Sequence, residues 1–400
     1  MQLINRNNSV KKKIRILQVI TTLGMGGAER QLVDVVTNTN STEFFHRVCF
    51  LHNPDSFAVE IRDSGNEVVN LNVTKKYGWL TASRKLAHQI DEFRPDVMHS
   101  WLFDADLSAR LTRLSGNKIP LLSSVQLPNY EPVSIEAAQW SPLKIKGMRY
   151  LDIITSKLAK TTFVACSNFV GQSIVKHLHA KEANVKVIYN SVNPASLDKK
   201  KTEFVPLRRE LGIPENSFVF INLGRHDPQK GQRFLIRAFK EILPECQDSY
   251  LLIAGHPGSL TEELKSLAKE CGIAERVIFT GSREDIGSLL QMADIFVFPS
   301  LFEGLGIALI EAMYKRLPCI ATRVPPLTEI LTDEKTGLFF DAGNVPQLAE
   351  VMTRLYKDEL LRKELGENAF KSVNERFLSQ VIISQWENLY RETYLSVKTR

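Results

Sequence analysis

The chain of 400 residues is long enough for two domains, each with its own hydrophobic core. Its 44% hydrophobic and 24% charged residues are typical of a globular protein, and every apolar run falls well short of the roughly 20 residues that span a bilayer. The five cysteines are scattered without C-x-x-C spacing, which argues against a zinc site or a disulfide framework and favours a reducing compartment. The run that follows the charged N-terminus, residues 14–20, is typical of a first core strand rather than of the apolar region of a signal peptide, so we expect no signal peptide.

The formal net charge of +6 is unevenly distributed along the chain. Residues 1–200 contain 26 Lys and Arg against 17 Asp and Glu, whereas residues 201–400 contain 25 against 28. A basic N-terminal half fits contact with an anionic membrane surface or with a phosphate-bearing acceptor. It fits an ordinary solvated surface equally well.

Short apolar runs alternate with helical periodicity along the whole chain, a pattern typical of βαβ units and parallel sheets. The runs predicted as strands span residues 15–20, 47–51, 67–70, 97–100, 121–125, 162–166, 185–189, 218–223, 250–254, 277–279, 295–299, 319–322 and 337–340. Helical patterns between them include residues 28–37, 232–242, 260–271 and 347–356.

The stretch 191–206 is rich in Lys, Ser, Asn and Pro and has no core periodicity, so we place the interdomain linker there. The predicted domains are then residues 1–198 and 199–378, followed by a long amphipathic helix within 379–400. We expect an α/β protein with two doubly wound parallel sheets of Rossmann type that face each other across a cleft. Ligands of such sheets bind beyond the C-terminal ends of the strands.

A glycine-rich turn, residues 21–30, follows the first predicted strand and opens the first helix. It fails as a dinucleotide-binding fingerprint, because Gly24 and Gly26 are present but Glu29 occupies the position of the third glycine. The simplest alternative is a tight turn that serves folding only. Glycine also permits close approach of the backbone to a ligand, since it has no Cβ.

Asp104 and Asp106 form a D-x-D pattern, which in one class of transferases holds a metal ion. Here the pattern begins a helical segment with leucines at 107, 111 and 114. We therefore interpret Asp104 as an N-cap whose oxygen accepts backbone N–H bonds, and we expect no essential metal.

Residues 140–160 combine apolar residues at helical spacing with five Lys or Arg. This pattern fits a basic amphipathic helix that lies at a membrane interface. It also fits a helix that packs on the core and solvates its basic side.

A basic turn, Gly224 to Gly231, follows the strand predicted at residues 218–223. Arg225 offers a planar fork of donors that suits phosphate oxygens, and Lys230 adds a mobile point charge. Both residues come after the C-terminal end of a strand, where ligands of open α/β sheets bind.

The most informative motif is Glu303 to Glu311, which follows the strand predicted at residues 295–299. A glycine-rich turn opens a helix, with one carboxylate before the turn and the other about one helical turn inside, roughly 7 Å beyond Gly306. The free amides at the start of such a helix suit an anion. Two hydroxyl-bearing groups with a phosphate between them would match this layout, and a nucleoside diphosphate sugar has that form.

The E-x7-E spacing, together with the turn Gly224 to Gly231, resembles the family 4 retaining glycosyltransferases of the two-domain GT-B architecture. The segment Gly26-Gly27-Ala28-Glu29-Arg30 is similar to one found in many family members. The resemblance extends over almost the whole chain, and it implies that the C-terminal helix crosses back onto the N-terminal domain.

The resemblance also implies roles for individual residues. Glu303 would hold hydroxyls of the donor sugar, Glu311 would hold the ribose, and Arg225 and Lys230 would stabilise the departing diphosphate. Family members often read H-x-H at the end of the fourth strand, where this chain has His99 and Trp101, so either side chain could contact the sugar. The remaining residues expected at the donor are Gly26, Gly27, Gly304, Leu305, Gly306, Ile307 and, in the turn 280–285, Arg283.

We therefore expect a retaining, metal-independent glycosyltransferase without a cofactor, which moves a sugar from a nucleoside diphosphate sugar to a glycan or lipid-linked acceptor in cell-surface polysaccharide or lipopolysaccharide synthesis. The alternatives are a non-catalytic relative that binds nucleotide-sugar or polysaccharide, and a nucleotide-sugar epimerase on the same fold. A glycan phosphorylase would need a Schiff-base lysine that we cannot identify. We expect a cytoplasmic location, peripheral contact with the inner face of an anionic membrane, and no nucleic-acid partner.

Overall fold

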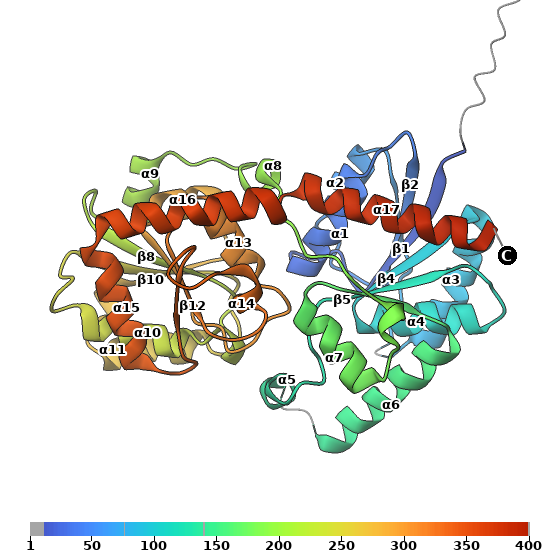
Figure 1. The fold of residues 1–400 in the computed structure, drawn as a ribbon, viewed down its shortest axis with the longest axis horizontal. Coiled ribbons are helices and arrows are strands. Elements are labelled where there is room, and N and C mark those ends of the chain that lie inside the picture. The colour runs from blue at the N-terminus through green and yellow to red at the C-terminus, as the bar shows by residue number, and fades with distance from the viewer. Residues whose placement is uncertain (1–11, 76, 139–140, 399–400) are drawn as a thin grey trace, which may run out of the picture.

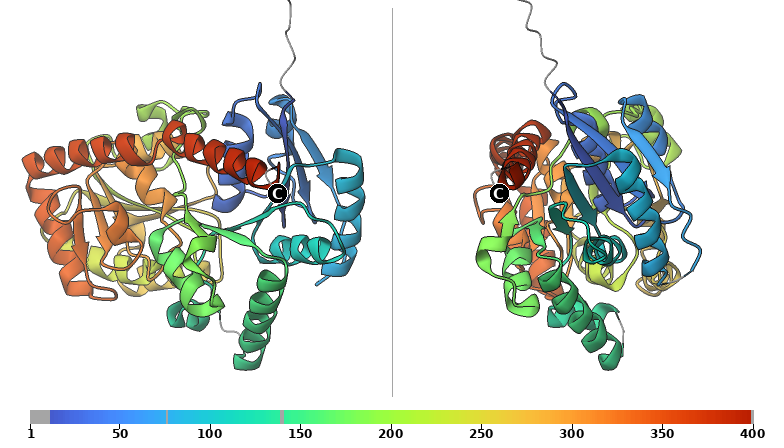
Figure 2. Two further views of the ribbon diagram at one scale, coloured as in Figure 1. Left: turned by 45° about the vertical axis from the view of Figure 1, so that its right-hand side comes forward. Right: turned by 90° about the vertical axis from the view of Figure 1, so that its right-hand side faces the viewer.

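The computed structural model describes residues 12–398, apart from residues 76 and 139–140. Two α/β lobes lie side by side, the N-terminal lobe in blue to green and the C-terminal lobe in yellow to red (Figure 1). In each lobe helices cover both faces of a central sheet (Figure 2). None of the helices in these residues has both the length and the apolar character that crossing a bilayer requires.

The N-terminal lobe is built on a parallel sheet of seven strands among the described residues, in the order β3-β2-β1-β4-β5-β6-β7. The order reverses between β1 and β4, which is the doubly wound arrangement. The strands are β1 (Ile14–Ile20), β2 (Phe44–Phe50), β3 (Glu67–Asn70), β4 (Val97–Trp101), β5 (Leu121–Val125), β6 (Thr162–Ala165) and β7 (Val185–Val187). The helices are α1 (Gly27–Asn38), α2 (Ala58–Asp63), α3 (Trp79–Phe93), α4 (Phe103–Leu114), α5 (Pro132–Ala138), α6 (Pro142–Leu158), α7 (Asn168–Leu178) and the short 3₁₀ helix η1 (Glu182–Asn184).

The C-terminal lobe repeats this plan with a parallel sheet of six described strands, in the order β10-β9-β8-β11-β12-β13. The strands are β8 (Phe218–Leu223), β9 (Ser249–Ala254), β10 (Val277–Gly281), β11 (Ile295–Phe298), β12 (Cys319–Thr322) and β13 (Leu338–Phe340). The helices are α10 (Gln232–Ile242), α11 (Thr261–Glu270), α12 (Ile286–Met292), α13 (Ile307–Tyr314), α14 (Leu327–Ile330), α15 (Val345–Lys357), α16 (Glu359–Arg376), and the 3₁₀ helices η2 (Pro228–Lys230) and η3 (Ala274–Arg276).

The sequence of β1 shows why these strands read as continuous apolar runs. Successive side chains of a strand point to opposite faces of the sheet. Ile16 and Ile20 are fully buried in one hydrophobic cluster, whereas Leu17 and Val19 are fully buried in another. Because helices cover both faces of a parallel sheet, both sets of side chains must be apolar.

Each predicted strand is present, and the boundaries differ by three residues at most, at the start of β2. The predicted linker is more ordered than its composition indicated. It contains α8 (Pro194–Leu197), which Asn193 caps through its side-chain oxygen, and the start of α9 (Phe204–Glu210). Pro194 stands in the first turn of α8, where a missing N–H costs nothing.

The chain passes between the lobes twice, and the two passages lie together. A β-bridge joins Val192 in the first passage to Leu378 in the second. From there α17 (Ser379–Lys398) lies along the N-terminal lobe, as Figure 1 shows. Its side chains Ile382, Trp386 and Tyr390 are buried in the same cluster as residues of β1 and β4, so the last helix completes the N-terminal core.

Candidate functional site

The turn after β8 is pressed against the end of β11. Gly231 has a φ of 62°, and a Cβ at this position would overlap the carbonyl oxygen of Pro299. Glycine is therefore required here by both backbone conformation and space. The result is that Lys230, one residue earlier, lies beside the loop that follows β11.

Lys230 and Glu303 form an ion pair at the centre of this arrangement. Lys230 Nζ lies 2.6 Å from Glu303 Oε1, with 21% and 8% of the two side chains exposed. Gln229 supports the same loop, because its Nε2 donates to the carbonyl oxygen of Phe302 at 2.9 Å. The two predicted site residues are thus brought together, and ligand groups bound to them would be immediate neighbours.

Arg225 occupies the outer end of the same turn. Its side chain is 64% exposed, and its guanidinium pairs with Asp227. An exposed guanidinium keeps donors available to an incoming anion, because a single carboxylate does not use all five N–H groups. Arg225 therefore remains a candidate ligand for phosphate.

The glycine-rich loop Gly304 to Gly306 is packed against the N-terminal lobe. A Cβ on Gly304 would overlap the carbonyl oxygen of Gln126, and Ser167 Oγ donates to the carbonyl oxygen of Gly304 at 2.7 Å. Gly306 has a φ of 104° and precedes Ile307, the first residue of α13. The two lobes are therefore in direct contact at the loop that opens α13.

The first residues of α1 and α13 lie close together across this contact. A Cβ on Gly27, the first residue of α1, would stand 3.3 Å from Ile307 Cδ1. Gly26 precedes α1 in an extended conformation without a side-chain cap, and the Glu29 carboxylate stands beside it. A helix N-terminus carries unpaired amides and the positive end of the helix dipole, which favour an anion.

Glu311 lies on α13 and is partly buried. Burial first, and then the nearby charge of Asp34 on α1, raise the pKa of Glu311 to about 7. Asp34 is itself held by Arg30 at 2.9 Å and by Asn193 Nδ2 at 3.2 Å. In the described structure no hydrogen bond or ion pair engages the Glu311 carboxylate, so it can accept hydroxyl donors from a ligand.

His99 and Trp101 do not reach the site, contrary to the expectation that one of them contacts a sugar. Both are fully buried. The His99 ring nitrogens lie 2.9 Å from Tyr390 Oη and 2.8 Å from Ser124 Oγ, and Trp101 Nε1 donates to Gln18 at 2.8 Å. Burial holds the pKa of His99 well below its ordinary value. We therefore assign His99 to the packing of α17 rather than to catalysis.

The two aspartates of the D-x-D pattern serve separate structural contacts. Asp104 does not cap α4, because the N-cap is Leu102 and no side chain caps the helix. Instead Asp104 accepts a hydrogen bond from Trp79 Nε1 at 2.7 Å. Asp106 is buried and accepts a 2.6 Å hydrogen bond from Ser100 Oγ.

Arg283 is engaged by carboxylates in the turn after β10. Its Nη2 lies 2.7 Å from Asp285 Oδ2, and its Nη1 pairs with Glu210 of α9. These hydrogen bonds raise the pKa of Arg283. The guanidinium is therefore largely committed to holding α9, and contact with a nucleotide base remains a prediction.

Several residues at the interface escaped the sequence reasoning. Glu329 of α14 accepts hydrogen bonds from the backbone N–H groups of Asn168 and Phe169, so it caps α7 from the other lobe. Ser167 is recognisable in the sequence as an N-cap of α7, and its oxygen accepts from Val170 N. Its bond to Gly304 carries no local signal, because the two residues are 137 positions apart.

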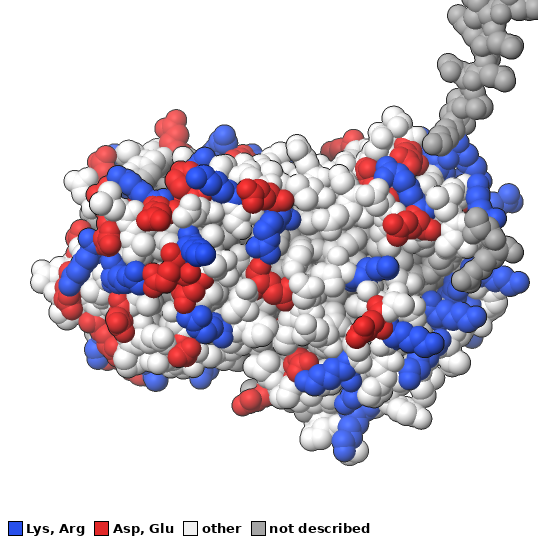
Figure 3. Space-filling view, in the orientation of Figure 1, with Lys and Arg blue, Asp and Glu red and all other residues white. Residues whose placement is uncertain are grey.

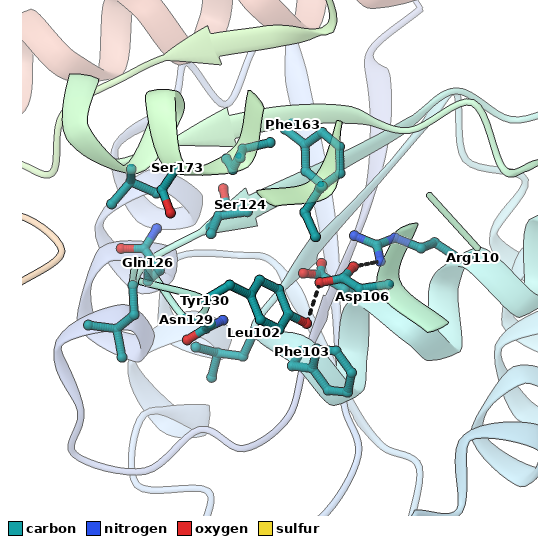
Figure 4. Close-up of a pocket in the computed structure, with 16 residues that line it drawn as sticks. Leu102, Phe103, Asp106, Arg110, Ser124, Gln126, Asn129, Tyr130, Phe163 and Ser173 are labelled. Atoms are coloured by element: carbon teal, nitrogen blue, oxygen red, sulfur yellow. Dashed lines mark hydrogen bonds and ion pairs between the residues drawn. The ribbon is translucent and has the colours of Figure 1, made fainter. Parts of the chain in front are cut away.

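Two neighbouring cavities lie beside the site. The larger, of about 610 Å³, extends from Arg225 and Gln229 to Met148 of α6. The smaller, of about 210 Å³, lies in the N-terminal lobe at the ends of β5 and β6 (Figure 4). The two cavities adjoin, because four residues line both of them: Phe103, Leu127, Asn129 and Tyr130.

Comparison with known families gives two adjoining matches. The family described as "Glycosyltransferase Family 4" matches residues 25–196, and the one described as "Glycosyl transferases group 1" matches residues 205–372. Together these matches cover both lobes and the turns that carry the site.

Individual relatives are more distant. N-acetyl-alpha-D-glucosaminyl L-malate synthase of Bacillus anthracis is 30% identical over 55% of this chain and 58% of its own length. UDP-Gal:alpha-D-GlcNAc-diphosphoundecaprenol alpha-1,3-galactosyltransferase of Escherichia coli is 28% identical over 53% of this chain and 55% of its own. The chain therefore spans a little over half the length of these curated relatives. The crystal structure of Anabaena Alr3699/HepE in complex with UDP shares the fold, with a TM-score of 0.79, 20% identity, and 95% and 100% of the two chains covered.

Proposed function

Because this chain belongs to the family 4 glycosyltransferases of GT-B fold, we propose that it transfers a sugar from a nucleoside diphosphate sugar to a hydroxyl of a glycan or glycolipid, with retention of anomeric configuration. The observation that carries the proposal is the Lys230–Glu303 ion pair of 2.6 Å, in the loop that opens α13 and meets the N-terminal lobe. A cation, a carboxylate and the start of a helix are thereby near the contact between the lobes. The structural neighbour from Anabaena is in complex with UDP, which supports a nucleotide as a ligand.

The leaving diphosphate would lie between the two helix N-termini. Lys230, Arg225 and the amides of the loop Gly304 to Ile307 would offset the charge that develops on it as the bond to the sugar breaks. Donors that are already oriented stabilise such charge without reorganising during the reaction. Glu303 would accept hydrogen bonds from sugar hydroxyls, and Glu311, one turn further along α13, from the ribose.

In the transfer step, the acceptor hydroxyl oxygen forms a bond to the anomeric carbon while the bond from that carbon to the β-phosphate oxygen breaks. The pair of electrons of the broken bond stays with the nucleoside diphosphate, and the acceptor proton passes to its leaving oxygen. Attack on the face that the diphosphate leaves gives retention without an enzymic nucleophile. Inverted stereochemistry in the product would refute this mechanism.

We propose that no divalent metal is needed, because protein cations and helix N-termini already supply positive charge around the diphosphate. The test is the rate of transfer after dialysis against EDTA. An unchanged rate is expected, and a loss that Mg²⁺ or Mn²⁺ restores would overturn metal independence.

We further propose that the N-terminal lobe contacts an anionic membrane. On the outer side of α6, Leu143, Tyr150 and Leu158 are 84%, 67% and 63% exposed. Lys144, Lys146 and Lys157 flank them, and basic side chains gather on this part of the surface (Figure 3). Exposed apolar side chains with flanking lysines suit the headgroup region of an anionic bilayer. Sedimentation with anionic but not with neutral vesicles is expected, and equal sedimentation with both would contradict the electrostatic part.

The experiment that tests the whole proposal is a screen of the purified protein against a panel of nucleoside diphosphate sugars, read by thermal shift and by slow donor hydrolysis. A ligand that binds only the folded state raises the melting temperature. One donor should stabilise and be hydrolysed, and Glu303→Ala and Arg225→Ala should lose hydrolysis. Stabilisation without hydrolysis or transfer would favour the non-catalytic alternative.

A further inference from the structure

The two neighbouring cavities differ sharply in the chemistry of their walls. The larger one is bordered by apolar side chains from both lobes, among them Ile135, Ile145, Met148, Leu260 and Phe302. Its far end reaches Arg225, on the turn assigned to the diphosphate. Apolar walls of this extent favour an apolar ligand. A ligand rich in hydroxyls would lose its hydrogen bonds to water there and find few on the walls to replace them.

The smaller cavity ends instead in a buried polar group. Arg110 is 1% exposed and pairs with Asp152, which also accepts a 2.9 Å hydrogen bond from Tyr130 Oη. Figure 4 labels Arg110 and Tyr130, and its dashed lines mark these two contacts. Asp106 borders the same space. Buried charged groups are costly to maintain unless each is paired and hydrogen-bonded, so their position in a cavity indicates a role for them.

Two polar atoms of these cavities lack a partner in the described part of the chain. They are Arg110 Nε in the smaller cavity and Ser134 Oγ in the larger one. Ser134 is 8% exposed, so water reaches it poorly. A buried donor without an acceptor is unfavourable, and oxygen atoms of a ligand would satisfy both.

The charge at the polar end selects among oxygen ligands. Among the described residues that line the smaller cavity, the single cation, Arg110, is balanced by Asp152, and Asp106 adds a further acidic group. A phosphate or carboxylate would therefore find no surplus positive charge there. Uncharged hydroxyls can donate to the carboxylates and accept from the guanidinium, and a ligand oxygen in the larger cavity can accept from Ser134.

From these observations we propose that the two neighbouring cavities hold the acceptor, and that the acceptor is an amphiphile with an uncharged, hydroxylated ring at the polar end and a hydrocarbon chain along the apolar wall. The inference rests on the proposed transferase function and names its acceptor class. The outer side of α6 supports a hydrocarbon chain over a free sugar, because the helix that borders the cavity with Ile145 and Met148 also exposes Leu143 and Tyr150.

The test uses octyl glycosides of glucose, galactose and N-acetylglucosamine below their micellar concentrations, each compared with its methyl glycoside by calorimetric titration of the full chain. The ratio of the two affinities isolates the contribution of the octyl chain, because both glycosides carry the same sugar. At least one octyl glycoside should bind tenfold or more tightly than its methyl counterpart. Equal affinities across the panel, or no binding by any octyl glycoside, would overturn the proposal.

Two variants test where the octyl chain of the ligand binds. Met148→Glu introduces a charge into the apolar wall and should reduce the octyl preference at least tenfold. Leu360→Glu makes the same kind of change on α16, where the side chain is 80% exposed and borders neither cavity, and should keep the preference. If both variants keep the preference for octyl glycosides, the octyl chain does not lie against Met148 and the assignment of the cavity is wrong.

The contact of the ligand with Ser134, which lines the larger cavity, is tested with Ser134→Ala. Because Ser134 Oγ has no hydrogen-bond partner among the described residues, its removal should leave the melting temperature unchanged or raise it, while binding of the octyl glycoside weakens about three- to tenfold. Unchanged binding would show that no oxygen atom of the ligand reaches Ser134, contrary to the proposal. Donor hydrolysis without acceptor separates the two levels of inference: hydrolysis that persists while the octyl preference is absent refutes only the acceptor class, whereas absent hydrolysis and transfer with every donor refutes the transferase function.

Discussion

Lys230→Met should separate the contribution of the central ion pair to stability from its contribution to catalysis. The pair is short, at 2.6 Å, and mostly buried, with 21% and 8% of the side chains exposed. Removing one member of such a pair leaves the other charge buried without compensation, which costs about 3–5 kcal/mol when burial is complete. Because Lys230 keeps some exposure and Gln229 Nε2 lies 3.5 Å from Glu303 Oε2, we expect about 2–3 kcal/mol, measured by urea unfolding.

The kcat of Lys230→Met should fall by more than the loss of stability can explain. Lys230 is proposed to face the leaving diphosphate, and the loss of one oriented donor of this kind costs about 10²- to 10³-fold in kcat. The double variant Lys230→Met, Glu303→Gln removes both charges. It should recover stability relative to Lys230→Met alone, with a coupling energy of at least about 1 kcal/mol, but it should not recover activity.

Two results would refute this reasoning. Additive effects of the two substitutions on unfolding would show that the ion pair does not couple the residues in solution. A kcat within about threefold of the unaltered protein in Lys230→Met would show that the cation does not stabilise the transition state. Rates must be measured well below the melting temperature of each variant, so that unfolding does not contribute.

Three further predictions concern Glu311, the contact between the lobes at Gly304, and the packing of α17. Burial raises the pKa of Glu311 from 4.5 to about 7, so the folded state loses stability as pH rises between these values. Urea unfolding should therefore show that Glu311→Gln is about 1–3 kcal/mol more stable than the unaltered protein at pH 8 but differs little from it at pH 4. An equal gain at both pH values would contradict the raised pKa of Glu311. Gly304→Ala places a Cβ on the carbonyl oxygen of Gln126, so the lobes should separate locally and transfer should fall about 10²-fold with a small change in melting temperature; normal activity would show that the contact is dispensable. Trp386 on α17 is 4% exposed, so Trp386→Ala should leave a cavity in the core and lower the free energy of unfolding in urea by about 3–5 kcal/mol. A loss below about 1 kcal/mol would show that α17 is only loosely packed.

The strands were predictable because their signal is local. A parallel strand that is covered on both faces reads as a short continuous apolar run, and β8 (Phe218–Leu223) and β12 (Cys319–Thr322) have the predicted bounds. The glycine-rich turns after β1, β8 and β11 were also evident in the sequence, since a turn that opens a helix needs residues without a Cβ at specific points. Fold class and the position of the candidate site follow from these two local signals.

The roles of individual side chains were less accessible. The sequence places His99 at the end of a strand, where it would lie beside the cleft. In the structure its Nδ1 is hydrogen-bonded to Oη of Tyr390, which comes 291 residues later. Asp104 precedes an apolar helical pattern as an N-cap would, yet its oxygen accepts from Trp79. In both cases the partner comes from another element, and the pattern around the residue contains no information about that element.

The sequence by itself determined the two parallel sheets, the order of their strands along the chain, and the turns that carry Arg225, Lys230, Glu303 and Glu311. Tertiary structure alone decided that Lys230 pairs with Glu303 and that the first residues of α1 and α13 lie close together. It also decided that α17 covers His99 and that apolar side chains of both lobes enclose one cavity. The physical reason is distance along the chain: periodicity and turn chemistry act over a few residues, whereas these contacts join residues tens to hundreds of positions apart and exist only once two sheets and the last helix have packed together.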